Sequence, residues 1–269
     1  MTRDPVTRRL ITRGLITRRA TLGGLIGGSG LVLSGCEKIS QIPGFQGMLE
    51  SVENLSRGGQ RLVLSSSAPL AREYQPSDIT RNFKANGTVR PQTVEYQRLM
   101  MTEFSDWRLK VDGLVQNPME FTLPQLKALP SRTQITRHDC VEGWSAIGQW
   151  KGVPLSTILM TARLKPNARY IVFHCADDLE NSPDGRGLYY ESIDLVDAFH
   201  PQTIMAYEMN GQTLPVPHGA PLRLRVERQL GYKMAKYVMR IEAVESYAGL
   251  GLGRGGFWED RGYEWYAGI

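Results

Sequence analysis

The chain has 269 residues, with 32 Lys and Arg against 27 Asp and Glu, which gives a formal net charge of +5. The basic excess lies in the first 35 residues, which hold six Arg and one Asp, so residues 36–269 carry 26 basic and 26 acidic side chains. A net charge of zero gives no support to nucleic-acid binding, which would need a basic excess in the folded part.

The first 35 residues are typical of an export signal and not of a folded domain. A twin-arginine motif is matched by Thr17-Arg18-Arg19-Ala20-Thr21-Leu22, and the apolar run that follows is too short and too rich in Gly to span a membrane. A lipobox is matched by Leu33-Ser34-Gly35-Cys36, in which Cys36 would be lipidated and become the new N-terminus. The alternative is a cleaved signal peptide in which Cys36 has no role.

This segment predicts export to the periplasm by the twin-arginine route, with a membrane attachment made only by the lipid on Cys36. We predict three parts: a signal over 1–35, a tether rich in Gly, Ser and Gln over 36–67, and one folded domain over 68–269.

Short strands and short helices mix in the folded part without a repeating order, which predicts an α+β fold. An alternating run over 107–111 followed by Asp112-Gly113 indicates a strand and a tight bend. Thr122 and Pro124 indicate the start of a short helix over 122–129.

Further along the chain, Ser192 is placed to cap a helix over 193–199. Asn210-Gly211 can form the turn of a hairpin between 203–209 and 212–214. Strands are also expected at 170–175 and, half-buried, at 222–226 and 237–241. The tail over 251–266 mixes Gly with aromatic residues and is expected to fold over the domain.

The stretch from Ile135 to Leu159 is the most informative part of the sequence. A β-type run ends in His138-Asp139 and is followed at once by Cys140, so a strand holds one side of the cysteine and leaves the other open. We predict a loop through Gly148 and then a helix with Pro154 near its first turn. A thiol held in this way suits a metal ligand or a nucleophile.

Two other interpretations of Cys140 stay open. A free cysteine often serves as a small buried hydrophobic residue. Cys175 is the remaining cysteine once Cys36 is lipidated, and in an oxidising compartment Cys140 and Cys175 could form a disulfide. A protein that folds around its metal before export would already use Cys140 as a ligand, which favours the metal interpretation.

The sulfite-oxidase family of molybdoenzymes has a molybdenum-binding segment that closely resembles Arg137-His138-Asp139-Cys140-Val141-Glu142-Gly143-Trp144-Ser145 and the later Trp150-Lys151-Gly152-Val153-Pro154-Leu155. The resemblance extends over about Thr80 to Glu245. It implies a mixed-sheet molybdopterin-binding domain with short helices and a Mo-molybdopterin cofactor. It also implies that Cys140 is the one protein ligand to molybdenum, which agrees with the preference of a soft metal for thiolate.

The resemblance further implies which residues contact the pterin and its phosphate. A phosphate needs several donors and positive charge on rigid backbone, for which Arg223 offers a planar fork and Lys233 a point charge. The cofactor-binding candidates beside Cys140 are Thr80, Arg81, Asn82, Asp184, His218, Arg223, Gly231, Tyr232 and Lys233.

The catalytic candidates beside Cys140 are Tyr189, which matches the family's substrate-side tyrosine better than Tyr190, and His138 as a nearby donor. We expect oxygen-atom transfer of the sulfite-oxidase type on a small oxyanion or an S- or N-oxide. Electrons would be exchanged with a separate cytochrome, either c-type or a membrane b-type.

Two alternatives to sulfite-oxidase-like chemistry remain. Sulfite would need an Arg-rich anion pocket, to which Arg137 is the one evident contributor, so reduction of methionine sulfoxide is the alternative within the family. The alternative of another class is an anchored lipoprotein without enzymatic activity, held together by a Cys140–Cys175 disulfide.

Overall fold

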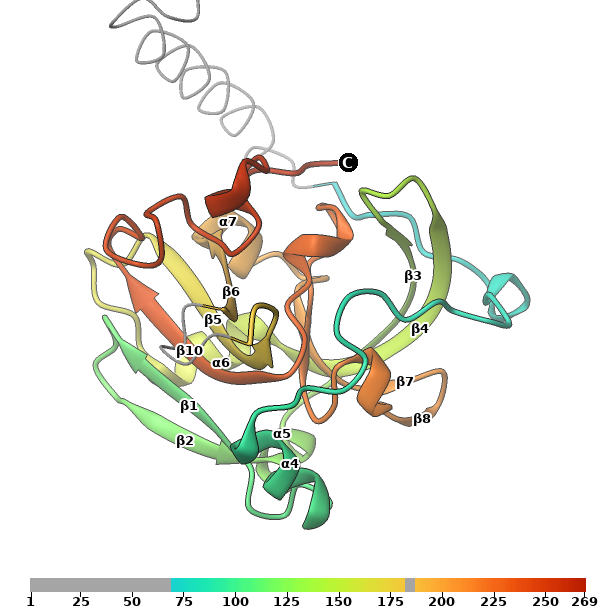
Figure 1. The fold of residues 1–269 in the computed structure, drawn as a ribbon, viewed down its shortest axis with the longest axis horizontal. Helices are drawn as coiled ribbons and strands as arrows, with labels where there is room; N and C mark the ends of the chain where they lie inside the picture. Colours follow the sequence, from blue (N-terminus) through green and yellow to red (C-terminus); the bar gives the residue numbers. More distant parts are fainter. Residues whose placement is uncertain (1–68, 182–186) are drawn as a thin grey trace, which may run out of the picture. The chain divides into compact units, whose positions relative to one another are not determined.

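The structure is a computed structural model that describes residues 69–181 and 187–269 (Figure 1). The predicted signal over 1–35, the predicted tether over 36–67 and the cofactor candidate Asp184 lie outside the described residues. No helix within the described ranges has the length and apolar character that crossing a bilayer requires.

The described residues form two sheets, which lie on the left and the right of Figure 1. The first sheet is mixed and has the order β2-β1-β10-β5-β6, with β1 parallel to β10 and the other pairs antiparallel. Its strands are β1 (Arg108–Gly113), β2 (Met119–Thr122), β5 (Tyr170–Asp178), β6 (Leu188–Asp194) and β10 (Val238–Val244).

The second sheet is antiparallel and has the order β3-β4-β7-β8, with β9 paired to β7. Its strands are β3 (Arg132–Asp139), β4 (Ser145–Pro154), β7 (Ile204–Met209), β8 (Gln212–Thr213) and β9 (Arg223–Arg225). Short helices join the strands: α4 (Val94–Met101), α5 (Leu123–Ala128), α6 (Leu155–Ala162) and α7 (Leu195–Ala198). The α+β prediction is confirmed.

One hydrophobic core is shared by both sheets. Leu109 of β1 and Phe173 of β5 belong to the same buried cluster as Val153 of β4, Tyr207 of β7 and Leu224 of β9. Because residues from both sheets remove apolar surface from water together, neither sheet is an independent unit.

The structure confirms two of the local predictions, the start of a helix near Thr122 and the turn at Asn210-Gly211. The Thr122 hydroxyl accepts a hydrogen bond from the Gln125 amide at 3.1 Å, and the Gln125 side chain accepts one from the Thr122 amide at 2.8 Å, so a capping box starts α5. Asn210 and Gly211 both have positive φ and form the turn between β7 and β8.

The predicted loop through Gly148 is wrong, because β4 already begins at Ser145 and pairs Gly148 with Thr136 of β3. A Cβ on Gly148 would lie 3.1 Å from the Phe83 ring, so this glycine makes room for an aromatic side chain. Hydrogen bonds to β3 and β7 outweigh the low intrinsic strand preference of glycine.

Two further boundaries differ from the prediction. Ser192 lies inside β6 opposite Val172, and the helix begins later, with the Asp194 carboxylate as its cap. Strand β9 is buried along its whole length and is not half-buried, because it pairs with β7 and its two arginines are covered by the fold.

The tail after residue 249 folds over the domain, as predicted. Phe257 is 2% exposed and Trp265 is 7% exposed. The indole of Trp265 donates to the Ser192 hydroxyl at 2.8 Å, and Gly256 forms an isolated bridge with Glu191. The tail therefore packs against the outer strand of the first sheet.

Gly152→Ala should destabilise the fold, because a Cβ there would overlap the Met205 carbonyl where β4 crosses β7. Overpacking of this kind costs about 1–3 kcal/mol or more. Gly249→Ala is the matched control, since an added Cβ meets nothing within 4 Å, and surface changes stay within about 0.5 kcal/mol. Urea unfolding measures both variants, and equal midpoints would contradict the close contact.

Candidate active site

Cys140 is held in the tight loop that joins β3 to β4. Its amide donates to the Trp144 carbonyl at 2.9 Å, and the Gly143 amide donates to the Cys140 carbonyl at 2.9 Å. Gly143 has a φ of +85°, which this short loop needs and glycine adopts without strain. The thiol accepts a hydrogen bond from the Asn86 side chain at 3.2 Å.

Both described cysteines are free, so the alternative of a Cys140–Cys175 disulfide is wrong. Burial raises the pKa of the Cys140 thiol, which keeps it protonated at neutral pH unless a cation lies beside it. A metal ion provides that charge and converts the thiol to a thiolate ligand. Among the described residues no group of three or more His, Cys, Asp or Glu could hold a metal.

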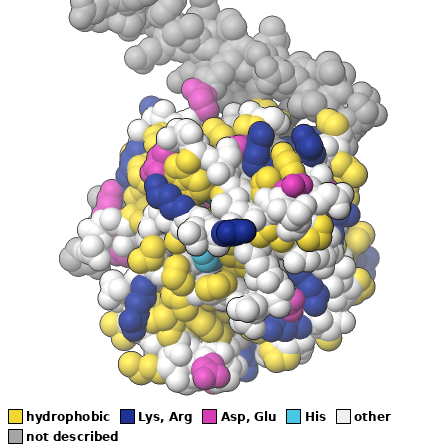
Figure 2. Space-filling model, turned by 90° about the vertical axis from the view of Figure 1, so that its right-hand side faces the viewer, with side chains coloured by type: hydrophobic (Ala, Val, Ile, Leu, Met, Phe, Trp, Pro, Cys, Tyr) yellow, Lys and Arg dark blue, Asp and Glu magenta, His cyan; other side chains and the backbone are white. Residues whose placement is uncertain are grey.

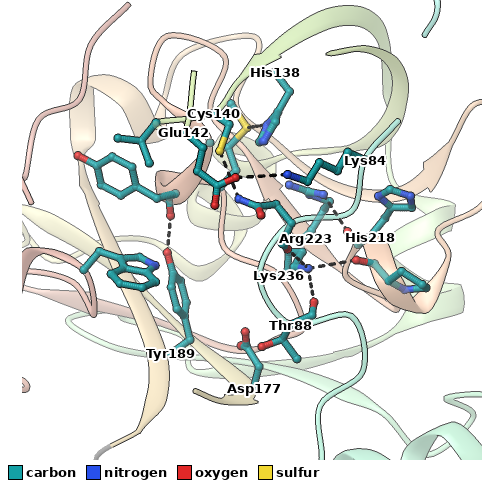
Figure 3. Close-up of a pocket in the computed structure, with 18 of the residues that line it drawn as sticks. Lys84, Thr88, His138, Cys140, Glu142, Asp177, Tyr189, His218, Arg223 and Lys236 are labelled. Atoms are coloured by element: carbon teal, nitrogen blue, oxygen red, sulfur yellow. Dashed lines mark hydrogen bonds and ion pairs between the residues drawn. The ribbon is translucent and has the colours of Figure 1, made fainter. Parts of the chain in front are cut away.

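A cavity of about 230 Å³ opens beside Cys140. The predicted site residues that line it are His138, Cys140, Tyr189, His218, Arg223, Gly231 and Tyr232. Figure 3 shows Tyr189 on one side of this cavity and Lys84, His218 and Arg223 on the other, with Cys140 between them and Asp177 at the bottom. The cavity therefore has a basic side, and the cysteine lies between that side and Tyr189.

Arg223 is buried on the basic side without a counter-charge. Its Nη1 donates to the His218 carbonyl at 2.9 Å and its guanidinium carbon lies 4.8 Å from the Trp150 ring centre, but its Nε is buried with no hydrogen-bond partner. No carboxylate of residues 69–181 or 187–269 pairs with it. Burial, followed by the charge of Arg225, lowers the pKa of Arg223 to about 9. A bound anion is what this guanidinium needs.

Arg225 packs on the same Trp150 ring at 4.3 Å and is fully paired. It donates to both oxygens of the buried Glu227 carboxylate, at 2.9 and 2.6 Å. Its Nη1 lies 3.1 Å from His138 Nδ1, and because an arginine can only donate, Nδ1 accepts and the imidazole proton sits on Nε2. Burial, followed by the charge of Arg225, lowers the pKa of His138 well below its usual value, so this ring stays neutral.

Lys236 completes the basic side and was not among the predicted site residues. Its Nζ donates to the carbonyl oxygens of Asn86 at 2.8 Å, of Pro217 at 3.1 Å and of Thr88. Burial, followed by the charge of Arg223, lowers its pKa to about 7. The same two causes, followed by the charge of Lys236, lower the pKa of His218 to about 4.

Lys233, the predicted phosphate contact, does not line the cavity. It is fully buried and paired with Glu191 and Glu259. The sequence shows two lysines three residues apart beside a glycine, and Lys236 faces the cavity. The spacing could not predict which of the two lysines faces the cavity, because the side chain of Lys233 is held by carboxylates that are far away in the chain.

The Thr80-Arg81-Asn82 element lies just outside the cavity lining. The Thr80 amide donates to the Ile147 carbonyl and its hydroxyl accepts from the Ile147 amide, both at 3.0 Å, so this element is fixed to β4. The residues that follow it, from Phe83 to Thr88, reach the cavity. Roles of Thr80, Arg81, Asn82, Lys233 and Asp184 in binding the cofactor stay predictions.

Tyr189 lines the cavity. Tyr190 is not a lining residue, and its hydroxyl donates to the Asp260 carboxylate at 2.6 Å. The hydroxyl of Tyr189 donates to the Tyr232 carbonyl. Burial raises the pKa of Tyr189 far above its usual value, so the phenol keeps its proton. Its catalytic role stays a prediction.

Asp177, near the end of β5, is a cavity residue that the sequence did not reveal. It is 5% exposed and its Oδ1 has no hydrogen-bond partner. Burial raises its pKa to about 6, against the charge of Lys236, which lowers it. An unpaired acceptor of this kind can receive a hydrogen bond from a ring N–H or an amino group of a ligand.

These residues fit a cofactor that brings its own metal, an anionic group and N–H donors. Cys140 offers a thiolate, Arg223 and Lys236 offer donors for a phosphate, and Asp177 offers an acceptor for a pterin ring. Such a constellation is compatible with a redox enzyme that binds a cofactor.

Comparison with known proteins gives the family. The model of the oxidoreductase molybdopterin binding domain matches residues 96–249, which is more than half of the chain. The chain belongs to this family of sulfite-oxidase-type molybdopterin-binding oxidoreductases, so its cofactor is Mo-molybdopterin and the prediction of an enzyme is confirmed.

A relative from Azospira oryzae is provisionally named a protein-methionine-sulfoxide reductase subunit, YedZ1. It is 38% identical over 256 residues, which is 95% of this chain and 87% of the relative. The crystal structure of the sulfane dehydrogenase SoxCD from Paracoccus pantotrophus matches 53% of this chain and 39% of that chain, with 25% identity and a TM-score of 0.47.

Arg223 and Arg225 both pack on Trp150, but replacing each with Met should affect the stability of the apoprotein differently. Arg223→Met removes an uncompensated buried charge, so the apoprotein should be no less stable, while retention of molybdopterin falls by about tenfold or more because the anion loses its partner. Arg225→Met leaves Glu227 buried and unpaired and should cost about 3–5 kcal/mol. Urea unfolding and pterin content after gel filtration test the pair, and similar destabilisation by both variants would contradict this assignment.

Lys236 predicts a pH dependence of apoprotein stability. Its pKa is about 7 in the fold, against about 10.4 in the unfolded chain. Between these two pH values the lysine is protonated in the unfolded chain and neutral in the fold, so the free energy of unfolding rises with pH above about 7. Below about pH 7 the lysine is protonated in both states, and the fold carries the full cost of burying its charge. From pH 7 to 9 the wild-type apoprotein should gain about 1–2 kcal/mol relative to Lys236→Met.

The control for this effect is Lys84→Met, which removes an exposed lysine from the same cavity. The holoenzyme should show a flatter profile, because a bound anion favours the charged lysine. Parallel profiles for wild-type and Lys236→Met apoprotein, measured by thermal unfolding across pH 6 to 9, would contradict the low pKa.

Proposed function

We propose that this protein reduces S-oxides, with methionine sulfoxide as its physiological substrate class. The balanced reaction converts one sulfoxide, two electrons and two protons to one thioether and one water. The sulfur–oxygen bond breaks, sulfur is reduced, and the oxygen leaves as water. The name of the Azospira oryzae relative supports this direction of oxygen-atom transfer.

The observation that carries this proposal is the absence of a cation among the other described residues that line the cavity around Tyr189. Tyr189, Tyr232, Trp258 and Tyr263 all line the cavity and form a connected group, since Tyr189 donates to the Tyr232 carbonyl and Tyr263 contacts the rings of Tyr232 and Trp258. The described basic residues of the cavity are Lys84, His138, His218, Arg223 and Lys236, and the last three form the group suited to the cofactor phosphate. An uncharged sulfoxide needs no cation beside it, and the unbranched methionine side chain that carries it packs well against aromatic rings.

Sulfite-oxidase-like chemistry on sulfite takes second place for the same reason. Arg137, the one evident candidate for an anion pocket, is not among the cavity residues and pairs with Asp139 at 2.9 Å. Glu142 lies beside Cys140 and would repel a dianion, although Lys84 partly offsets its charge at 3.4 Å.

The chain's own residues would position and shield the reaction. When bound, the cofactor would supply the two-electron oxygen-atom transfer chemistry. Cys140 holds the metal in a loop with fixed hydrogen bonds, and Asn86 orients its sulfur. Tyr189 would remain a neutral phenol whose proton stays on its oxygen.

We further propose that the protein works in the periplasm after export by the twin-arginine route, attached to the membrane through a lipid on Cys36. Electrons would come from a separate cytochrome, c-type or membrane b-type. The word "subunit" in the name of the relative supports a separate electron-transfer partner.

Metal analysis and turnover test this proposal together. Wild-type protein should contain about one molybdenum per chain and, with an artificial reductant, convert methionine sulfoxide to methionine. Cys140→Ser should lose molybdenum and turnover, because the hard hydroxyl is a poor substitute for thiolate. Cys175→Ser, which changes the other buried free cysteine, should keep both.

Sulfite is the comparison substrate for the same enzyme. The proposal predicts that S-oxides reoxidise the reduced centre and that sulfite does not reduce the oxidised centre at a comparable rate. A centre reduced rapidly by sulfite and inert to S-oxides would overturn the direction that we propose.

A further inference from the structure

The outer wall of the cavity comes from the tail of the chain. Trp258 and Tyr263 line the same cavity as Cys140, yet they lie beyond residue 249, where the match to the family model ends. Figure 2 shows hydrophobic side chains gathered near a histidine and a basic side chain on one face of the molecule. The tail thus adds residues of its own to a site that the family domain builds.

The wall is anchored by buried charges. Glu259, next to Trp258, is 1% exposed and pairs with Lys233, which also pairs with Glu191 of β6. Removing one partner of such a group leaves an unpaired buried charge, so the contact strongly favours one position of the tail.

Further contacts hold the segment from its outer side. Asp260 accepts from the Tyr190 hydroxyl at 2.6 Å and from the Leu252 amide at 2.9 Å. Arg261 donates from Nε to Glu180 at 3.1 Å. The short segment that carries Trp258 is therefore fixed from both sides.

The rings of the wall pack on each other and stay partly open to solvent. Trp258 and Tyr263 stack with centroids 5.3 Å apart and planes 28° apart, and Tyr232 meets Tyr263 edge-on at 5.1 Å. Tyr263 is 38% exposed and Val141, next to Cys140, is 48% exposed. The wall therefore leads from the molecular surface into the cavity.

We propose that Trp258 and Tyr263 bind the side chain of a methionine sulfoxide residue and make the enzyme selective for sulfoxide within flexible polypeptide segments over small sulfoxides. This inference rests on the proposed function. A methionine side chain is long and unbranched, so it can follow the aromatic wall inward while its backbone stays at the exposed rim. Dimethyl sulfoxide lacks the chain that would contact the wall and gains nothing from it.

The two rings act on binding and not on the chemical step, so KM and kcat should separate. The experiment uses the molybdenum-loaded enzyme with an unfolded peptide that contains methionine sulfoxide and, separately, with dimethyl sulfoxide. Trp258→Ala and Tyr263→Ala should lower kcat/KM for the peptide about tenfold, mainly by raising KM, and change kcat/KM for dimethyl sulfoxide less than about twofold. Trp258→Phe should retain most of the peptide activity.

Tyr266→Ala is the matched control, because it removes a tail aromatic that is not a cavity residue. A second measurement avoids turnover: the reduced, methionine-containing peptide should quench tryptophan fluorescence of the wild type, and the titration should weaken about tenfold in Tyr263→Ala. Molybdenum content checks that each variant is loaded, and Trp258→Leu with Tyr263→Leu replaces the alanine variants if those do not fold.

Each outcome distinguishes the two proposals. A wild-type enzyme that reduces no sulfoxide overturns the proposed function, whatever the variants do. An active wild type whose Trp258 and Tyr263 variants lose both substrates equally, or lose neither, overturns the role of the wall alone. Peptide selectivity that falls in these variants and not in Tyr266→Ala supports the inference.

Discussion

A guanidinium buried without a carboxylate is the constraint on which this site depends. Arg223 is 4% exposed, and its nearest charged neighbour of the same strand, Arg225, has the same sign. Taking such a charge out of water is costly unless an opposite charge meets it. The fold therefore contains a place that a bound anion would stabilise, which is what a cofactor with a phosphate provides. Arg225 packs on the same indole, but its charge is balanced by Glu227, so it needs no bound anion.

The same polar network lies next to Cys140, the proposed metal ligand. Gln134 of β3 donates to Glu227 at 2.9 Å, Glu227 pairs with Arg225, and Arg225 donates to His138, two residues before Cys140. Strand β3 is thus joined to Arg225 at the end of β9 and to Glu227 just after it. A Cβ on Gly231 would overlap the His138 ring, so this glycine lets the next loop approach closely. The cysteine and the basic side of the cavity are held in one rigid frame, which suits a cofactor that must contact both.

The other side of the cavity is built differently. It consists of aromatic and aliphatic side chains, and part of it comes from a tail that a buried Lys233 and two glutamates hold in place. The basic residues His218, Arg223 and Lys236 lie within the part of the chain that the family model matches, whereas Trp258 and Tyr263 lie beyond it. Under the proposed function, the first group would hold the cofactor and the second would contact the substrate.

What the sequence by itself determined is local or rests on the family motif. The capping box at Thr122, the positive-φ turn at Asn210-Gly211 and the cysteine directly after β3 are signals read within a few residues, and the structure confirms them. Tertiary structure decided which polar groups meet. Lys233 does not line the cavity, because it pairs with Glu191 and Glu259, which are 42 and 26 residues away in the chain. Lys236 and Asp177 line the cavity, which the sequence did not predict. Gly148 lies in a strand because it pairs with Thr136 of β3. Periodicity and spacing report the neighbours of a residue along the chain, whereas burial and charge pairing depend on neighbours that only folding brings together.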